Sequence, residues 1–214
     1  ITERTKLIFL NSPSNPAGTA YTLGELKAIG EVLLKHPDIL IASDDIYEYI
    51  LWSESPFANI VNACPDLKDR TIVLNGVAKA HCMTGWRIGF AACHPDLMKA
   101  MKKIQSQSTT CATSIAQHAA TAAFNASRDD FFMPMLDAYR ERHDYVVDSL
   151  NAIDGINAIP GDGTFYTFFN AQALINRLGL KDDLELTELL LEKANIALVP
   201  GTAFGSPGYL RLSF

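Results

Sequence analysis

The stretch Ile39-Leu40-Ile41-Ala42-Ser43-Asp44-Asp45-Ile46-Tyr47 joins an apolar run directly to two carboxylates and a phenol. The run from Ile39 to Ala42 has the length and composition of a buried strand. Such a strand delivers the residues after it to the carboxyl edge of its sheet, where open α/β sheets bind ligands. A solvated surface carboxylate is less expected directly after an apolar strand than elsewhere. We therefore expect Asp44 and Tyr47 at a ligand-binding edge.

Comparable apolar runs lie on both sides of this stretch, with helical patterns between them. The other strand candidates are Leu7 to Leu10, Thr71 to Leu74 and Ile88 to Ala92. Thr22 and Glu25 have the spacing of a capping box for a helix that runs to about Lys35. Further helices are expected over 95–105 and 114–125. This alternation is typical of βαβ units, so the sequence predicts an α/β fold with a mainly parallel sheet and flanking helices.

The pattern changes after residue 128. A long amphipathic helix is expected over 129–150, and it could connect two domains. Beyond it we expect a smaller α+β domain over 151–214, and residues 1–128 form part of a large domain. The elements expected in the smaller domain are strands at 165–169, 196–199 and 209–212 and a helix at 184–194.

Composition excludes several classes of protein. The 214 residues are 48% apolar and 20% charged, which excludes a disordered or collagen-like chain. A net charge of −6 without long basic runs argues against nucleic acid or a membrane surface as a partner. No signal peptide or membrane span is apparent, and the missing initial Met suggests that upstream residues were removed. We expect a soluble, cytoplasmic protein.

Cysteines and histidines give no sign of a metal site. The four cysteines, Cys64, Cys82, Cys93 and Cys111, are too widely spaced for a CxxC pair, and the five histidines show no ligand spacing. Reduced thiols are the default for so few cysteines in a chain with a sizeable core. We expect no metal.

Polar residues follow three of the expected strands. They lie in the segments 11–18, 43–47 and 75–79, which supply an amide, a carboxylate, a phenol and Lys79 to one rim of the sheet. Each residue alone is compatible with turn chemistry or a solvated surface position. Together, a lysine, an acid and an arginine facing one crevice suit pyridoxal phosphate chemistry, in which a lysine amine forms a Schiff base and an acid keeps the ring nitrogen protonated.

Four segments, in the same order along the chain, resemble the fold-type I, class I/II aminotransferases, most closely the bacterial aspartate aminotransferase subgroup. These segments are Asn11 to Gly18, Ser43 to Glu48, Gly76 to Gly89 and Tyr209 to Leu212. The resemblance implies a pyridoxal 5′-phosphate enzyme that exchanges an amino group between an L-amino acid, with aspartate as our guess, and a 2-oxo acid such as 2-oxoglutarate. It also implies a homodimer whose partner chain completes the site.

The resemblance implies four cofactor contacts besides the lysine itself. Lys79 resembles the lysine that forms the Schiff base and moves the proton between the substrate α-carbon and C4′ of the cofactor. Asp44 resembles the partner of the pyridine nitrogen. Tyr47 and Asn15 resemble donors to the ring's phenolate oxygen, and Arg87 resembles a phosphate anchor. The structural alternatives are a solvated lysine, a capping aspartate, a core tyrosine, a plain Asn-Pro turn and a surface ion pair.

Arg211 resembles the arginine that grips the substrate α-carboxylate with two parallel donors, and Asn15 is expected to share that substrate site. The structural alternative for Arg211 is a surface ion pair. In the family pattern, serine is frequent where Ala78 stands, and His81, Cys82 and Asp45 are further departures from it. Nothing matches the N-terminal portion of the family, so we expect an incomplete active site.

Two other functions remain open. A pyridoxal phosphate lyase of this fold, such as a cysteine-sulfur lyase, would use every residue named above. An aminotransferase-like sensor domain of a transcription regulator would carry its DNA-binding module upstream. Product analysis distinguishes the lyase from the transaminase, and the full-length sequence distinguishes the regulator from both.

Overall fold

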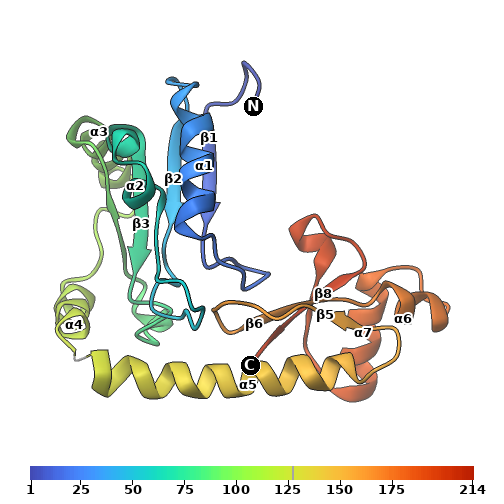
Figure 1. The fold of residues 1–214 in the computed structure, drawn as a ribbon. Helices are drawn as coiled ribbons and strands as arrows, with labels where there is room; N and C mark the ends of the chain where they lie inside the picture. The colour runs from blue at the N-terminus through green and yellow to red at the C-terminus, as the bar shows by residue number, and fades with distance from the viewer. Residues whose placement is uncertain (127) are drawn as a thin grey trace. The chain divides into compact units, whose positions relative to one another are not determined.

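The computed structural model describes residues 1–126 and 128–214, which form two compact units (Figure 1). The first unit comprises residues 1–13 and 21–133, and the second comprises residues 14–20 and 134–214. The segment 14–20 therefore belongs with the C-terminal part of the chain, although it directly follows the first strand.

The first unit contains a four-stranded sheet in the order β1-β2-β3-β4. Strands β1, β2 and β3 are parallel, and β4 pairs antiparallel with β3 at the edge. Their bounds are Leu7–Asn11, Leu40–Asp44, Thr71–Gly76 and Gly89–Ala92. The predicted α/β class with a mainly parallel sheet is confirmed, and all four expected strands are present.

Helix α1 (Leu23–Leu34) begins with the predicted capping box. The hydroxyl of Thr22 accepts a hydrogen bond from the Glu25 N–H at 3.2 Å, and the Glu25 carboxylate accepts one from the Thr22 N–H at 2.8 Å. Two amide groups that the helix itself cannot satisfy are thereby paired. The other helical elements of the first unit are α2 (Ile60–Ala63), η1 (Pro65–Arg70), η2 (Thr84–Trp86), α3 (Pro95–Ser106), α4 (Ser114–Phe124) and the π-helix η3 (Arg128–Phe132).

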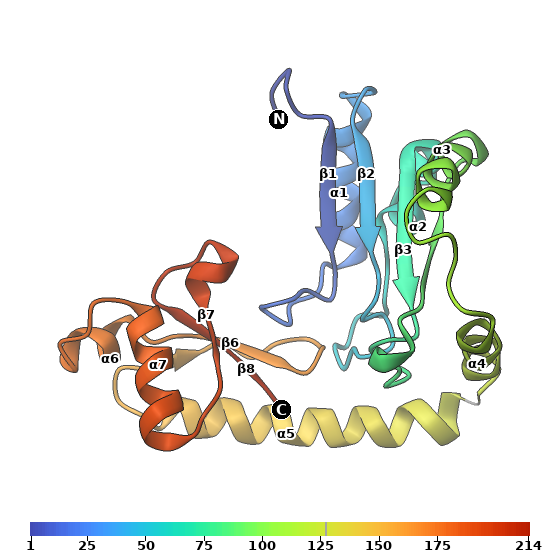
Figure 2. The ribbon, with the colours of Figure 1, turned by 180° about the vertical axis from the view of Figure 1, so that it is seen from behind.

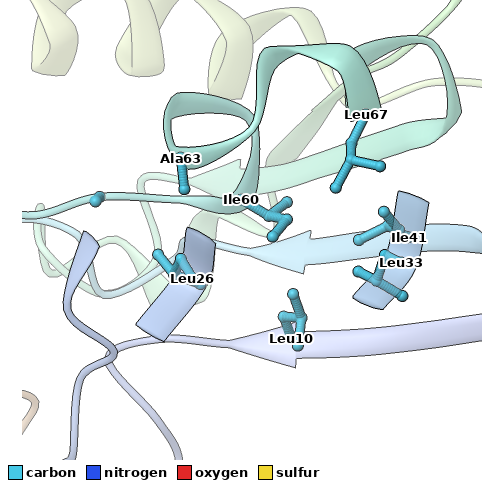
Figure 3. Packing of buried hydrophobic residues seen from close by; sticks show 8 residues of the cluster. Leu10, Leu26, Leu33, Ile41, Ile60, Ala63 and Leu67 are labelled. Carbon is cyan, nitrogen blue, oxygen red and sulfur yellow. The ribbon is translucent and has the colours of Figure 1, made fainter. Parts of the chain in front are cut away.

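The main core of the first unit lies between the sheet and the elements α1, α2 and η1 (Figure 3). Leu10 and Ile41 project from the strands toward Leu26, Leu33 and other apolar side chains of these helical elements. Each buried leucine or isoleucine contributes about 1.5–3 kcal/mol to stability. Figure 2 shows β1 and β2 in front of α1, so this helix covers one face of the two strands.

The second unit is built on an antiparallel sheet in the order β5-β6-β8-β7. The strand bounds are Asn157–Ala158, Tyr166–Asn170, Tyr209–Ser213 and Val199–Pro200, respectively. Its helical elements are α5 (Met133–Asn151), α6 (Gln172–Arg177), α7 (Asp183–Ala194) and η4 (Gly201–Phe204). Phe169, Ile175, Leu186 and Leu210 lie in its core. The expected α+β character is confirmed.

Two expected elements differ in extent from those observed. The strand predicted over 196–199 is reduced to Val199–Pro200, because pairing with β8 begins only at Val199. The helix expected over 129–150 is observed as η3 followed by α5. The division into 1–128, 129–150 and 151–214 stays a prediction. Among the described residues, no helix has both the length and the apolarity that crossing a bilayer requires.

Candidate active site

The parallel strands of the first unit end side by side, as the sequence predicts. Asn11 at the end of β1 is in register with Asp44 at the end of β2, and its side-chain amide donates to the Asp44 carbonyl at 3.0 Å. The Asp45 N–H donates to the Leu74 carbonyl of β3 at 2.9 Å. This alignment fixes the Asp44 carboxylate at the carboxyl edge of the sheet.

Asp44 is half-buried, and burial raises the pKa of its carboxyl group above the ordinary value. Two features oppose the rise in this pKa: the Ile46 N–H, which donates to Oδ1 at 3.4 Å, and the positive charge of Lys79. A half-buried carboxylate near a positive charge is suited to sharing a proton with a cationic partner.

Lys79 lies in the loop after β3, near Tyr47. Its Nζ is 5.9 Å from the centroid of the Tyr47 ring, and that ring is buried. Two backbone hydrogen bonds shape the loop: Cys82 N–H to the Lys79 carbonyl at 3.0 Å and Met83 N–H to the Val77 carbonyl at 3.3 Å. The structure thus brings three predicted residues of the first unit together, namely the amine, the carboxylate and the phenol.

A side-chain contact that the sequence did not indicate links the two loops. The Asn75 side chain donates to the Glu48 carboxylate at 2.8 Å and accepts from the Gly76 N–H at 2.7 Å. Glu48 follows Tyr47, and Asn75 precedes the lysine loop. Burial raises the pKa of Glu48, and the hydrogen bond from Asn75 opposes this rise in pKa. No sequence motif signals this pair, because its members are 27 residues apart.

Asp45 and His81, two departures from the family pattern, are both buried. The Asp45 carboxylate accepts hydrogen bonds from Ser43 Oγ at 2.7 Å and Asn59 Nδ2 at 2.8 Å. The His81 ring packs against Phe132 with a centroid separation of 5.0 Å, so this histidine occupies an aromatic core position. Burial lowers the pKa of His81, which keeps the ring neutral in that environment.

The contacts of Arg87 among the described residues do not indicate a phosphate-binding site. It lies just after η2 with a left-handed φ of 54°. Its side chain is exposed, and Nη1 donates to the Thr84 carbonyl at 2.8 Å. The assignment of Arg87 to a phosphate stays a prediction.

In the second unit, Arg211 and Asn15 are in direct contact. Nη1 of Arg211 donates to Asn15 Oδ1 at 2.7 Å. The guanidinium carbon lies 4.4 Å from the centroid of the Tyr166 ring and 5.1 Å from that of Phe204. Such stacking restricts the plane of the guanidinium group. Nε is buried and has no hydrogen-bond partner among the described residues, so a donor remains for a ligand.

Among the residues that the structure describes, no group of three or more histidine, cysteine, aspartate or glutamate side chains is placed to hold a metal ion. All four cysteines lie in the described part of the chain, and none of them forms a disulfide bond.

An amine, a carboxylate and a phenol thus lie at the carboxyl edge of a mainly parallel sheet in a protein of the α/β class. The chain matches the family described as aminotransferase class I and II over residues 1–214, and it belongs to that family. It is 51% identical to the aspartate/prephenate aminotransferase of Nitrosomonas europaea over 220 residues, which cover 100% of this chain and 55% of that protein.

Solved structures give the same result. The aspartate aminotransferase of Rhizobium meliloti superposes with a TM-score of 0.93 at 41% identity, over 100% of this chain and 55% of that one. An aspartate aminotransferase of Thermus thermophilus, solved with maleate, gives a TM-score of 0.87 at 37% identity, over 100% and 53%. The chain therefore spans about half the length of the relatives it matches.

Proposed function

We propose that the full-length protein is a pyridoxal-phosphate-dependent aminotransferase that exchanges an amino group between aspartate and a 2-oxo acid such as 2-oxoglutarate. The proposal rests on one observation. The Lys79 amine lies beside the buried Tyr47 ring, and its positive charge opposes the rise that burial causes in the pKa of the Asp44 carboxyl group. Membership in a family of aminotransferases, generally dependent on this cofactor, supports the reaction class.

The residues of the first unit fit this cofactor chemically. Lys79 supplies an amine for covalent attachment, and Asp44 supplies a carboxylate for the ring nitrogen. Tyr47 supplies a phenol for the ring oxygen, and Arg87 supplies a guanidinium for the phosphate. When bound, the cofactor supplies a protonated pyridine ring that accepts the electron pair left as the α-proton departs.

Proton transfer in this proposal is the work of Lys79. With the cofactor and an amino acid bound, the Lys79 amine would take the proton from the substrate α-carbon and return it to C4′ of the cofactor. The Asp44 carboxylate would hold a proton on the ring nitrogen of the cofactor during this transfer. Burial of Asp44 strengthens this interaction, because charges attract more strongly where water is scarce.

In the second unit, Arg211 and Asn15 form the proposed site for the α-carboxylate. The buried Nε, which lacks a partner among the described residues, is a donor that a carboxylate can satisfy. The hydrogen bond to Asn15 and the rings of Tyr166 and Phe204 hold the guanidinium in place. The maleate in the Thermus thermophilus structure supports a dicarboxylate as a suitable probe.

Two further parts of the proposal concern assembly and location. We propose a homodimer, since the resemblance to fold-type I enzymes implies that a partner chain completes the site. Four cysteines that form no disulfide bond among the described residues suit a reducing compartment, so we propose the cytoplasm. The mass of the full-length protein in solution tests the first point, and cell fractionation tests the second.

The activity is tested by incubating the full-length enzyme with pyridoxal phosphate, 2-oxoglutarate and a panel of amino acids. We expect glutamate to form, with aspartate converted to oxaloacetate and preferred over the other donors. Release of ammonia and a 2-oxo acid without consumption of 2-oxoglutarate would instead identify a lyase. A donor other than aspartate would correct the substrate and leave the reaction class intact.

A further inference from the structure

We propose that His143 is a positioning residue for the Asn15–Arg211 pair, acting through the loop 160–163. This inference rests on the proposed function, because it takes that pair as the site of the substrate carboxylate. The chain of contacts lies entirely within the second unit. It joins a buried imidazole on α5 to the segment 14–20.

His143 is 3% exposed and contacts the loop directly. Its Nε2 accepts a hydrogen bond from the Gly161 N–H at 2.9 Å, and its Nδ1 lies 2.9 Å from Asp144 Oδ1. Because a backbone N–H can only donate, Nε2 presents its lone pair, and the ring proton therefore resides on Nδ1 and is donated to Asp144. The imidazole thus has a defined tautomer and a defined orientation.

The loop holds the segment 14–20 by three hydrogen bonds. The N–H groups of Asp162 and Gly163 both donate to the Gly18 carbonyl, at 2.8 and 2.9 Å. The Asp162 carboxylate accepts from the Ala20 N–H at 2.9 Å. The two backbones are also closely packed, since a Cβ on Gly18 would lie 2.9 Å from the Gly163 carbonyl oxygen. Movement of the loop must therefore move this segment.

Within the segment, two backbone hydrogen bonds close a turn around Asn15. The Gly18 N–H donates to the Ser14 carbonyl at 2.8 Å, and the Ser14 N–H donates to the Thr19 carbonyl at 2.9 Å. Asn15 projects from this turn to accept the hydrogen bond from Arg211. The position of the Asn15 amide is thus determined by the clamped turn.

The same loop also leads into β6, whose first residue is Tyr166. The Tyr166 ring stacks on the Arg211 guanidinium. The Asn15 amide and the Tyr166 ring, which both orient Arg211, therefore depend on the loop that His143 holds. A displacement of about 1 Å at a binding group can cost as much as 100-fold in rate. Loss of the hydrogen bond to Gly161 should therefore measurably weaken binding of the substrate carboxylate.

The test uses the full-length, pyridoxal-phosphate-loaded enzyme with maleate as the probe. His143→Leu removes the acceptor, whereas His143→Gln can place an amide oxygen near the Nε2 position. We expect His143→Leu to weaken maleate binding by roughly tenfold or more, with KM for aspartate raised more than kcat is lowered. His143→Gln should recover most of the affinity. His118→Leu, at an exposed position of α4, is the matched control and should bind as the wild type does.

Cofactor content serves as the second readout, and we expect it to be unchanged in all three variants. Wild-type maleate affinity in a folded His143→Leu enzyme would overturn the proposal, as would equal weakening by Leu and Gln. If His143→Leu does not fold, the comparison of Asp162→Ala with Asp162→Asn decides: only the alanine should lose maleate affinity. A wild-type enzyme without transaminase activity would refute the proposed function. That result is distinct from any result with the His143 or Asp162 variants.

Discussion

At the scale of single residues, Asp44 is the group on which rate should depend most strongly after the lysine. Its carboxylate is half-buried and within the electrostatic influence of Lys79. We predict that Asp44→Ala slows the half-reaction with aspartate by about two to three orders of magnitude or more, because electrostatic stabilisation in such a site contributes about 3 kcal/mol or more. Single-turnover kinetics of the full-length enzyme measure this effect.

Asp66→Ala is the control for this prediction, since Asp66 is an exposed aspartate of the same unit. It should leave the half-reaction unchanged. Transamination close to the wild-type rate in Asp44→Ala would show that Asp44 only shapes the turn after β2.

Arg211 gives a prediction about affinity. A lysine ammonium cannot reproduce the two parallel donors of a guanidinium or its stacking on Tyr166. We predict that Arg211→Lys lowers kcat/KM by roughly ten- to a hundredfold, corresponding to about 1.5–3 kcal/mol for a hydrogen bond with a charged group. Steady-state kinetics with both amino acid and oxo acid should show the loss, and cofactor content should stay at the wild-type level.

Arg177→Lys is the matched control, because Arg177 pairs with the exposed Asp154 in the same unit. If Arg211→Lys instead loses pyridoxal phosphate and keeps its substrate affinity, the roles assigned to Arg87 and Arg211 must be exchanged.

At the scale of elements, the contact between the segment 14–20 and the loop 160–163 should limit substitution at Gly18. Its φ is +73°, and a Cβ would approach the Gly163 carbonyl oxygen to 2.9 Å. Gly179 has a similar φ of +68°, but a Cβ there would have no neighbouring atom within 4 Å, so Gly179→Ala isolates the cost of backbone conformation. We predict that Gly18→Ala destabilises the protein more than Gly179→Ala does.

Urea denaturation of the two variants measures this difference. We expect Gly179→Ala to cost about 1 kcal/mol of unfolding free energy, the usual cost of a strained alanine, and Gly18→Ala to cost more. Equal effects would show that the two backbones can separate without loss.

Asp183, at the start of α7, provides a pH-dependent link between elements. It is fully buried, and its carboxylate accepts hydrogen bonds from the Thr202 N–H and hydroxyl, both at 2.8 Å, and from the Gly208 N–H at 3.3 Å. Burial alone would raise the pKa of Asp183, but these hydrogen bonds outweigh it and the pKa is lowered. The carboxylate therefore anchors the segment that carries Phe204.

A lowered pKa in the folded state means that the ionised Asp183 stabilises the fold above the unfolded-state pKa of about 3.9, and that this stabilisation is lost as pH falls through the folded-state value. We predict that Asp183→Asn lowers the unfolding free energy by about 2 kcal/mol or more at pH 7, with a smaller difference below pH 4 or so. Denaturation at a series of pH values measures it, with the exposed Asp154→Asn as control. A difference that does not change with pH would contradict the assignment.

At the scale of the whole molecule, features that depend on local sequence were predictable. The capping box of α1 needs only Thr22 and Glu25, and both of its hydrogen bonds are present. The polar residues at the strand ends were predicted to meet because parallel strands align their carboxyl ends, and Lys79 is near enough for its charge to oppose the rise that burial causes in the pKa of the Asp44 carboxyl group. The roles of these residues came from the family resemblance and not from spacing.

Features that depend on backbone contacts between distant segments were not predictable. The segment 14–20 joins the second unit through backbone N–H groups at 162 and 163, which every residue type except proline carries. His143 lies within the amphipathic helix expected over 129–150, and nothing in that pattern predicts a hydrogen bond to Gly161. Strand β7 is short because its pairing with β8 begins only at Val199.

Covalent attachment of the cofactor to Lys79 tests the central claim most directly. The full-length protein is loaded with pyridoxal phosphate, reduced with borohydride so that the bond to the lysine becomes permanent, and digested for peptide mapping. The account predicts the label on Lys79 alone. A label on any other lysine, or a protein that retains no label after reduction, would contradict it.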